Sequence, residues 1–234
     1  MKTIGILGGM SAASTALYVA RLHEGVRQAR GGLHSADLLV RLLDFAPIAQ
    51  QQADGDWDGL GALMAAESRA LERGGAELLL LATNTMHKLA PQIEAAVSIP
   101  FLHLADATAA AIAAAGYTRP ALMATAFTME QDFYLARLRA AGLDPIVPNA
   151  ADRAETHRII YDELCRDVVR DDSRRSYEQI AQRLKEAGAD CLILGCTEVC
   201  MLLGEDNAPL PVFDTVAIHC DAALQLALTG SEKQ

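Results

Sequence analysis

Two short polar loops, each following an apolar run, contain the residues best suited to chemistry. Thr83 comes just after Leu78–Leu81, and Cys196 follows Cys191–Leu194 and Gly195. A thiol can act as a nucleophile or as an acid/base group, and we expect the N–H groups of a following helix to lower its pKa from about 8.5. A threonine at the end of a strand is commonly a helix cap. Its position, equivalent to that of Cys196, makes Thr83 a second candidate for chemistry.

The equivalence of the two loops comes from an internal repeat at an offset of 113 residues. At that offset Leu71–Thr85 aligns with Leu184–Glu198, and each copy has a helical pattern, a Gly-Ala-acid turn and four apolar residues. A weaker similarity relates Ile4–Ser11 to Pro120–Ala126. Ligands of open α/β sheets bind at the carboxyl ends of the strands. If two similar halves face each other, Thr83 and Cys196 approach one ligand from opposite sides.

The remaining glycine and cysteine motifs indicate simpler roles. Gly8–Ser11 precedes an expected helix, where backbone N–H groups can bind an anion. The loop matches neither common nucleotide fingerprint, so a small carboxylate is favoured over a nucleotide phosphate. Cys191 is expected in the core, and the other three cysteines have structural positions (Cys165, Cys200 and Cys220). The cysteines have no CxxC spacing and the six histidines do not cluster, which argues against a zinc site.

Strand-like and helix-like segments alternate through most of the chain, which predicts parallel sheets with right-handed crossovers. We therefore expect an α/β fold with two pseudo-symmetric lobes, each a mainly parallel sheet flanked by helices. The predicted boundaries are residues 1–98 plus 209–234 for the first lobe and residues 99–208 for the second. Within this scheme Leu38–Leu43 is predicted as a central strand, and Asp44–Asp56 as a polar connection. The sequence also predicts strands at Pro100–Leu104, Pro145–Val147 and Pro211–Phe213.

Composition excludes several classes of protein. Because 51% of the 234 residues are hydrophobic, the chain is globular and not disordered. The formal charge of −10 argues against binding to nucleic acids or to anionic membranes. The first apolar segment is too short for a signal peptide, and no apolar run approaches the roughly 18 residues of a membrane span. An odd number of cysteines, five, is typical of reduced thiols, so we expect a cytoplasmic location.

Several motifs together resemble the cofactor-independent aspartate/glutamate racemases. They are Gly8–Ser11, Gly31–Ala36, Thr83–Lys88, Thr128–Tyr134, Gly195–Glu198 and Pro211–Thr215. The resemblance covers essentially the whole chain and implies two α/β lobes, a homodimer and a site in the cleft between the lobes. Most members of the family use two cysteines, but here Thr83 stands at the first position, as in a subgroup resembling the bacterial L-aspartate/glutamate-specific racemases.

The resemblance also implies a mechanism and a set of contacts. Cys196 removes the α-proton of an L-amino acid, and Thr83, directly or through water, supplies a proton to the other face. Neither a pyridoxal lysine nor a metal is implied, so we expect no cofactor. The implied partner is a small-molecule amino-acid substrate, and the implied substrate-binding residues are Met10, Ser11, Gln52, Asn84, Thr85, Thr125, Thr128, Thr197 and Glu198.

The chain departs from close relatives at positions that bear on substrate choice. Alanines occupy positions 12, 13, 82, 124 and 126, and Cys165 stands where typical aspartate racemases have a carboxylate-binding lysine. Loss of a cation near position 126 removes a partner for a side-chain carboxylate. Aspartate or glutamate is the first prediction, and broader or neutral amino-acid specificity is an alternative. Two others are an arylmalonate-decarboxylase-like enzyme, which would also use a single cysteine, and a weakly active amino-acid-binding protein.

Overall fold

The structure, a computed structural model, describes residues 1–166 and 168–229, which form two compact units. The first contains Met1–Leu104 and the described residues from His219 onward, and the second contains Ala105–Ile218. Each unit has its own three-stranded parallel sheet flanked by helices. The predicted α/β class with two similar halves is therefore confirmed.

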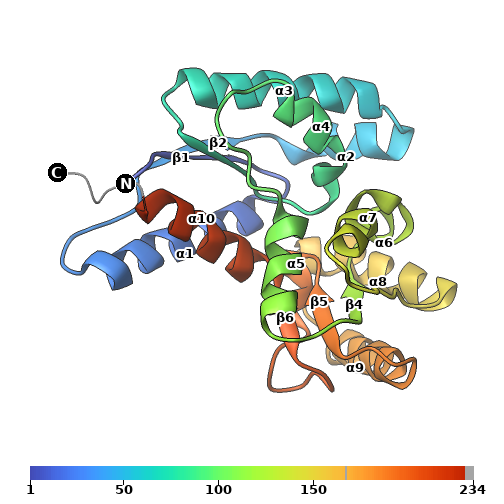
Figure 1. Cartoon of the computed structure of the whole chain (residues 1–234). Coiled ribbons are helices and arrows are strands. Elements are labelled where there is room, and N and C mark those ends of the chain that lie inside the picture. The colour runs from blue at the N-terminus through green and yellow to red at the C-terminus, as the bar shows by residue number, and fades with distance from the viewer. Residues whose placement is uncertain (167, 230–234) are drawn as a thin grey trace. The chain divides into compact units, whose positions relative to one another are not determined.

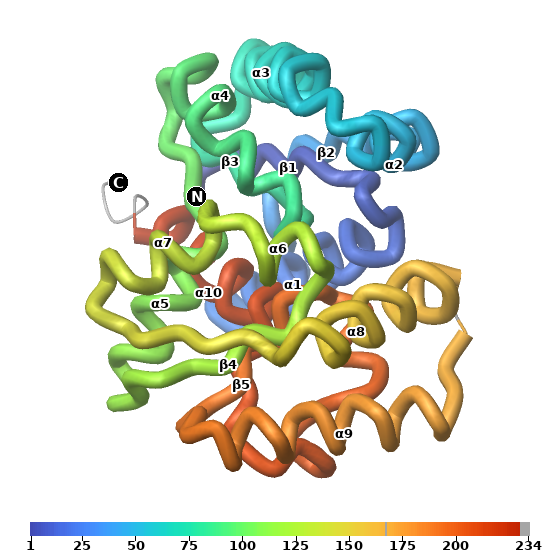
Figure 2. Tube along the Cα trace, turned by 90° about the vertical axis from the view of Figure 1, so that its right-hand side faces the viewer, coloured from blue at the N-terminus to red at the C-terminus, as the bar shows by residue number. Residues whose placement is uncertain are grey.

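In the first unit the sheet order is β2-β1-β3, so that β1 lies in the centre. The helices α2, α3 and α4 cover one face of this sheet, and α1 and α10 cover the other (Figures 1 and 2). The element bounds are β1 Ile4–Gly8, α1 Ala12–Arg30, β2 Leu38–Leu42, α2 Phe45–Asp54, α3 Trp57–Arg73, β3 Leu78–Leu81, the 3-10 helix η1 Thr85–Leu89, α4 Ala90–Glu94 and α10 Thr215–Leu228.

The core of the first unit follows from the apolar strands. All residues of β1 and β3 are buried, as expected for strands covered on both faces. On one face Leu7, Leu79 and Leu81 pack against α3 residues such as Leu60 and Met64. Burial of each of these side chains contributes on the order of 1.5–3 kcal/mol. This packing fixes the carboxyl ends of β1 and β3, where the candidate loops begin.

The second unit repeats this arrangement, with a sheet order of β4-β5-β6. Its elements are α5 Leu104–Ala114, β4 Pro120–Met123, α6 Ala126–Glu130, α7 Asp132–Ala140, α8 Ala150–Asp162, η2 Leu164–Arg166, α9 Asp171–Glu186, β5 Cys191–Leu194, η3 Thr197–Met201 and β6 Val212–Asp214. One core joins β5 to α8 and α9 through residues such as Leu192, Ile159 and Ile180. The α9–β5–η3 sequence repeats α3–β3–η1, as the 113-residue offset predicts.

Two predictions about the first sheet were wrong. Strand β2 lies at the edge and exposes Val40 and Leu42, because β1 takes the central position that Leu38–Leu43 was expected to hold. The expected connection Asp44–Asp56 is mostly the helix α2. The carboxylate of Asp44 accepts the N–H of Ala46 at 3.2 Å, and Gly55 ends the helix with a left-handed φ of 75°.

Two shorter strand predictions and one lobe boundary also need adjustment. Pro100–Leu104 is reduced to one bridge, between Leu79 and Phe101, and Pro145–Val147 is reduced to the bridge Ala121–Ile146. Strand β6 pairs with β5, so residues 212–214 belong to the second sheet, although the predicted range 209–234 assigned them to the first lobe. The last five residues of that range lie outside the described part of the chain. None of the described helices is long and apolar enough to cross a membrane.

Candidate active-site residues

The loop that carries Thr83 starts directly from the first sheet. The N–H of Ala82 donates to the carbonyl of Leu7 at 2.9 Å, which extends the β1–β3 pairing by one residue. The chain then turns, and the N–H of Thr83 donates to the carbonyl of Leu81 at 2.9 Å. Thr83 is partly exposed, and its hydroxyl is bonded to none of the described residues. This hydroxyl is therefore available to a ligand.

The equivalent loop in the second unit is built in the same way. The N–H of Gly195 donates to the carbonyl of Met123 at 2.8 Å, which repeats the bond made by Ala82. Cys196 follows in extended conformation and precedes η3. A Cβ at Gly195 would lie 2.7 Å from Leu122 Cδ1 and 2.9 Å from Ala124 Cβ, so glycine permits the close packing here. Ala124 is thus a packing residue, buried under the loop.

The thiol of Cys196 lies against a carboxylate. Its sulfur donates to Glu198 Oε2 at 2.8 Å, and the hydroxyl of Thr197 donates to the same oxygen at 2.5 Å. Burial of the sulfur, and then the negative charge of Glu198, raise the pKa of the Cys196 thiol well above its usual value. The expectation of a lowered pKa was therefore wrong, because a neighbouring carboxylate and desolvation both oppose the thiolate. At neutral pH the resting cysteine is a protonated thiol.

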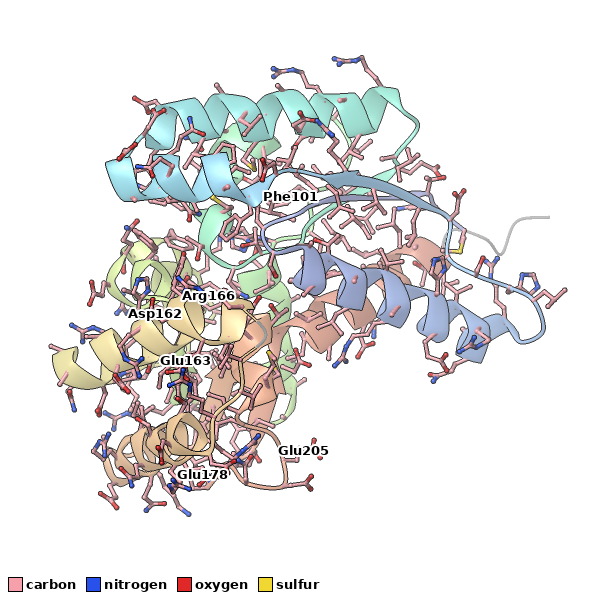
Figure 3. All side chains as sticks on the ribbon, turned by 180° about the vertical axis from the view of Figure 1, so that it is seen from behind. Phe101, Asp162, Glu163, Arg166, Glu178 and Glu205 are labelled. Carbon is pink, nitrogen blue, oxygen red and sulfur yellow. The ribbon has the colours of Figure 1, made fainter. Side chains whose placement is uncertain are left out.

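Aromatic side chains lie near this cysteine. Tyr161 on α8 packs against the same core as Cys196, and burial raises the pKa of its hydroxyl. The imidazole of His157 is 4.7 Å from the Tyr161 ring between centroids. Asp162, Glu163 and Arg166, labelled in Figure 3, mark the end of α8 and the 3-10 helix η2, which carries the exposed Cys165.

Other predicted site residues of the first unit lie at the carboxyl edge of its sheet or on α2. Met10 is buried in the loop after β1, and Ser11 caps α1 by accepting the N–H of Ser14 at 3.2 Å. Gln52 is 5% exposed, and its amide nitrogen lies 3.1 Å from the sulfur of Met86. Its carbonyl oxygen has no hydrogen-bond partner among the described residues. Asn84 and Thr85 begin η1, and both are buried.

The remaining predicted residues of the second unit form two pairs. Thr125 and Thr128 are buried at the start of α6, with their hydroxyl oxygens 3.2 Å apart. Thr197 and Glu198 adjoin Cys196 in η3. The predicted residues therefore gather at the carboxyl ends of β1 and β3 in one unit and of β4 and β5 in the other. Gln52, which comes from α2, is the exception.

Sequence reasoning missed the histidine that holds the Thr83 loop. The Nδ1 of His87 lies 2.7 Å from the carbonyl oxygen of Thr83, and its Nε2 accepts the N–H of Leu104 at 3.2 Å. The sequence placed His87 within the Thr83–Lys88 motif without giving it a role. Its four-residue spacing from Thr83, which brings the side chain near that carbonyl, was the signal that could have found it.

Comparison with known proteins agrees with this arrangement. A model of the family described as Asp/Glu/Hydantoin racemase matches residues 7–223. The crystal structure of a putative Asp/Glu racemase from Yersinia pestis is 43% identical, with a TM-score of 0.92, over 97% of this chain and 100% of that one. An aspartate racemase homologue from Pyrococcus horikoshii is 31% identical, with a TM-score of 0.85 and the same coverage. The broad-specificity amino-acid racemase RacX of Bacillus subtilis is 23% identical over 92% of this chain and 93% of its own length.

Proposed function

Because the chain belongs to the Asp/Glu/hydantoin racemase family, we propose that it is a cofactor-independent racemase that converts L-aspartate or L-glutamate to the D-enantiomer. The observation that carries this proposal is the equivalence of Thr83 and Cys196. Each follows the same backbone hydrogen bond at the end of a strand, one in each of two similar units. Two proton-transfer groups of this kind suit a reaction in which one group removes the α-proton and the other returns a proton to the opposite face.

The contact between Cys196 and Glu198 suggests how the resting thiol becomes a base. In the proposed first step the thiol proton passes to Glu198 Oε2, which lies 2.8 Å from the sulfur. The resulting thiolate removes the α-proton of the L-substrate and becomes a thiol again, and the electron pair of the broken C–H bond stays on the substrate as a carbanion. Backbone N–H groups and hydroxyls near the α-carboxylate stabilise that charge. Thr83, directly or through water, then gives a proton to the other face. Solvent returns a proton to the Thr83 oxygen, and Glu198 releases the proton that it took from the thiol.

Thermodynamics limits the activity of a racemase whose two proton-transfer groups, here Thr83 and Cys196, differ in acidity. The enantiomers have equal free energy in water, so kcat/KM must be the same in both directions. The pKa of an alcohol is nearer to the ~15.7 of bulk water than to the pKa of a thiol, which makes Thr83 a weak acid and base at neutral pH. The step at the D-face is therefore expected to be slow. Exchange of the α-proton of the L-enantiomer with solvent should outrun inversion.

Broader amino-acid specificity is the second candidate, and particular residues favour it. The family resemblance implies a cation at the positions of Ala126 and Cys165, and neither of these side chains can neutralise a side-chain carboxylate. The charge nearest the Cys196 thiol belongs to the carboxylate of Glu198, which would repel a second acid. A substrate with a neutral side chain avoids this repulsion. The similarity to a broad-specificity racemase points in the same direction.

The deciding experiment follows the α-proton by NMR in D2O, with chiral chromatography of the same samples. L-Asp, L-Glu and several neutral L-amino acids serve as substrates, and the Cys196→Ala variant serves as the control. Loss of the α-proton signal with growth of the D-enantiomer supports the racemase and names its substrate. Absence of exchange with every substrate, from correctly folded protein, contradicts it. Release of CO2 from a substituted malonate, or ligand-induced stabilisation without turnover, would instead support a decarboxylase or a binding protein.

We also propose that the enzyme works in the cytoplasm as a homodimer. None of the five described cysteines forms a disulfide, which fits a reducing compartment. Sedimentation velocity of the purified chain measures the oligomeric state, and a monomer at working concentrations would contradict this part of the proposal.

A further inference from the structure

We propose that His87 is a positioning residue that holds the backbone of Thr83 in place for the proton transfer on the D-face. The inference rests on the proposed function, in which Thr83 acts on that face. His87 lies in η1, four residues after Thr83, and its ring is 1% exposed. One ring nitrogen contacts the carbonyl of Thr83, and the other contacts the amide of Leu104, where the first segment of this unit ends.

The two backbone partners determine the protonation of the ring. A carbonyl oxygen can only accept, so Nδ1 of His87 carries a hydrogen and donates it to Thr83 at 2.7 Å. A backbone N–H can only donate, so Nε2 is unprotonated and accepts from Leu104 at 3.2 Å. His87 is therefore a neutral imidazole with its hydrogen on Nδ1. A second proton would displace the Leu104 amide, so the ring does not carry protons. It is a fixed structural link between the backbones of Thr83 and Leu104, and we call this link the strut.

Neighbouring rings prevent the His87 imidazole from turning. Phe101, labelled in Figure 3, stacks on it with centroids 5.6 Å apart, and His103 meets it edge-on at 4.5 Å. His219 lies 5.9 Å away and is itself held between the hydroxyl of Tyr18 and the carbonyl of Leu102, each at 2.9 Å. The strut therefore rests on a packed cluster within the first unit, and its two hydrogen bonds are well defined.

The consequence for Thr83 is a backbone fixed at both ends and a free side chain. Its N–H is bonded to Leu81 and its carbonyl to His87, while its hydroxyl has no partner among the described residues. Misplacement of a reacting group by about 1 Å can lower a rate on the order of 100-fold. Loss of the His87 bond should therefore impair the step that uses Thr83. The step that uses Cys196 should survive, because that residue relies on Glu198 in the other unit.

The experiment compares two replacements that each keep one half of the strut. The amide of His87→Asn lies near the original Nδ1 and can still donate to the Thr83 carbonyl. The amide of His87→Gln reaches the position of Nε2 and can still accept from Leu104. Tyr18→Phe is the matched control, since it removes one hydroxyl from the same buried cluster but keeps the aromatic ring, both hydrogen bonds of His87 and the bond of His219 to Leu102.

The full-length variants are assayed in D2O with pure L-substrate and, separately, with pure D-substrate. We expect His87→Gln to slow inversion and D-substrate exchange by more than about 10-fold, while exchange of the L-substrate with retained configuration stays within about 3-fold. His87→Asn should recover most of the loss, and Tyr18→Phe should leave the ratio of exchange to inversion unchanged. Equal losses in both half-reactions, or equal behaviour of the Asn and Gln variants, would overturn the proposal.

A spectroscopic measurement tests the strut independently of turnover. Long-range 1H–15N correlation spectra of the wild-type protein should show His87 as a neutral Nδ1–H imidazole. The 13C signal of the Thr83 carbonyl should move in His87→Gln and stay near its place in His87→Asn. An Nε2–H tautomer or a charged ring at neutral pH would reject the inference. If the wild-type protein exchanges no α-proton at all, the proposed function fails, and these spectra still decide whether His87 holds Thr83.

Discussion

Acid should destabilise the first unit through His219. Its ring is fully buried, its Nδ1 accepts from the hydroxyl of Tyr18, and its Nε2–H donates to the carbonyl of Leu102. Burial lowers the pKa of this imidazole from 6.5 to about 4. Both folded and unfolded chains hold it neutral above pH 6.5, so it adds no pH dependence there. Between about pH 6.5 and 4 only the unfolded chain takes up the proton, so stability falls as the pH decreases.

The size of this loss of stability follows from the shift in the pKa of His219. A difference of about 2.5 pKa units corresponds to about 3.4 kcal/mol once the pH is below 4, and to about 2 kcal/mol at about pH 5. Other groups also titrate over this pH range, and comparison with a matched variant removes their contribution to the change in stability. In Tyr18→Phe/His219→Gln the glutamine amide can still donate to Leu102, and the hydroxyl that bonded Nδ1 is absent. This double variant should be less stable than the wild type at neutral pH but should lose about 2 kcal/mol less on acidification to about pH 5.

The assay is chemical unfolding at about pH 7.5 and at about pH 5, followed by tryptophan fluorescence. Trp57 is the single tryptophan of the chain and lies in the same unit as His219, so its emission reports the unfolding of that unit. If the stability difference between wild type and double variant is the same at both pH values, His219 is not a desolvated neutral imidazole and the reasoning is refuted.

Three further predictions concern the candidate loops and the first sheet. Replacing Glu198 with glutamine should lower the pKa of the Cys196 thiol, because a negative charge beside the sulfur is removed. The ultraviolet absorbance of the thiolate, with Cys196→Ala as the blank, measures this pKa, and an unchanged value would contradict the prediction. Gly195→Ala should lower the free energy of unfolding by about 1–3 kcal/mol, measured by chemical unfolding, because the new Cβ would lie 2.9 Å from that of Ala124. Gly204→Ala is the control and should leave the stability nearly unchanged, because its Cβ would meet open space. Glu67→Gln should cost less than about 1 kcal/mol, because the ion pair with Arg41 is on the surface, and a larger loss would show that the pair stabilises β2 more than its exposure suggests.

The sequence alone determined the plan of each half and the placement of the candidate residues. Helical periodicity, the Gly-Ala-acid turn and the four apolar residues are local signals, and they give α3–β3 and α9–β5 with correct strand bounds. Because parallel strands bring their carboxyl ends to one edge, the positions of Thr83 and Cys196 at those ends also followed from the pattern. The α2 helix also had local signals, namely the N-cap Asp44 and the C-terminal Gly55. Because the segment is rich in polar residues, it was predicted as a connection and not as a helix.

Tertiary structure decided what depends on burial and on partners distant in the chain. The pKa of Cys196 rises because packing desolvates its sulfur beside Glu198, and no local pattern reports that environment. Strand β2 became an edge because β1 pairs on both sides, which the composition of one strand cannot reveal. The role of His87 requires the amide of Leu104, 17 residues away, and the state of His219 requires Tyr18, 201 residues away. Hydrogen bonds between residues so far apart in the chain form only in the folded protein. They determine the protonation state and the orientation of side chains whose positions alone could be predicted from the sequence.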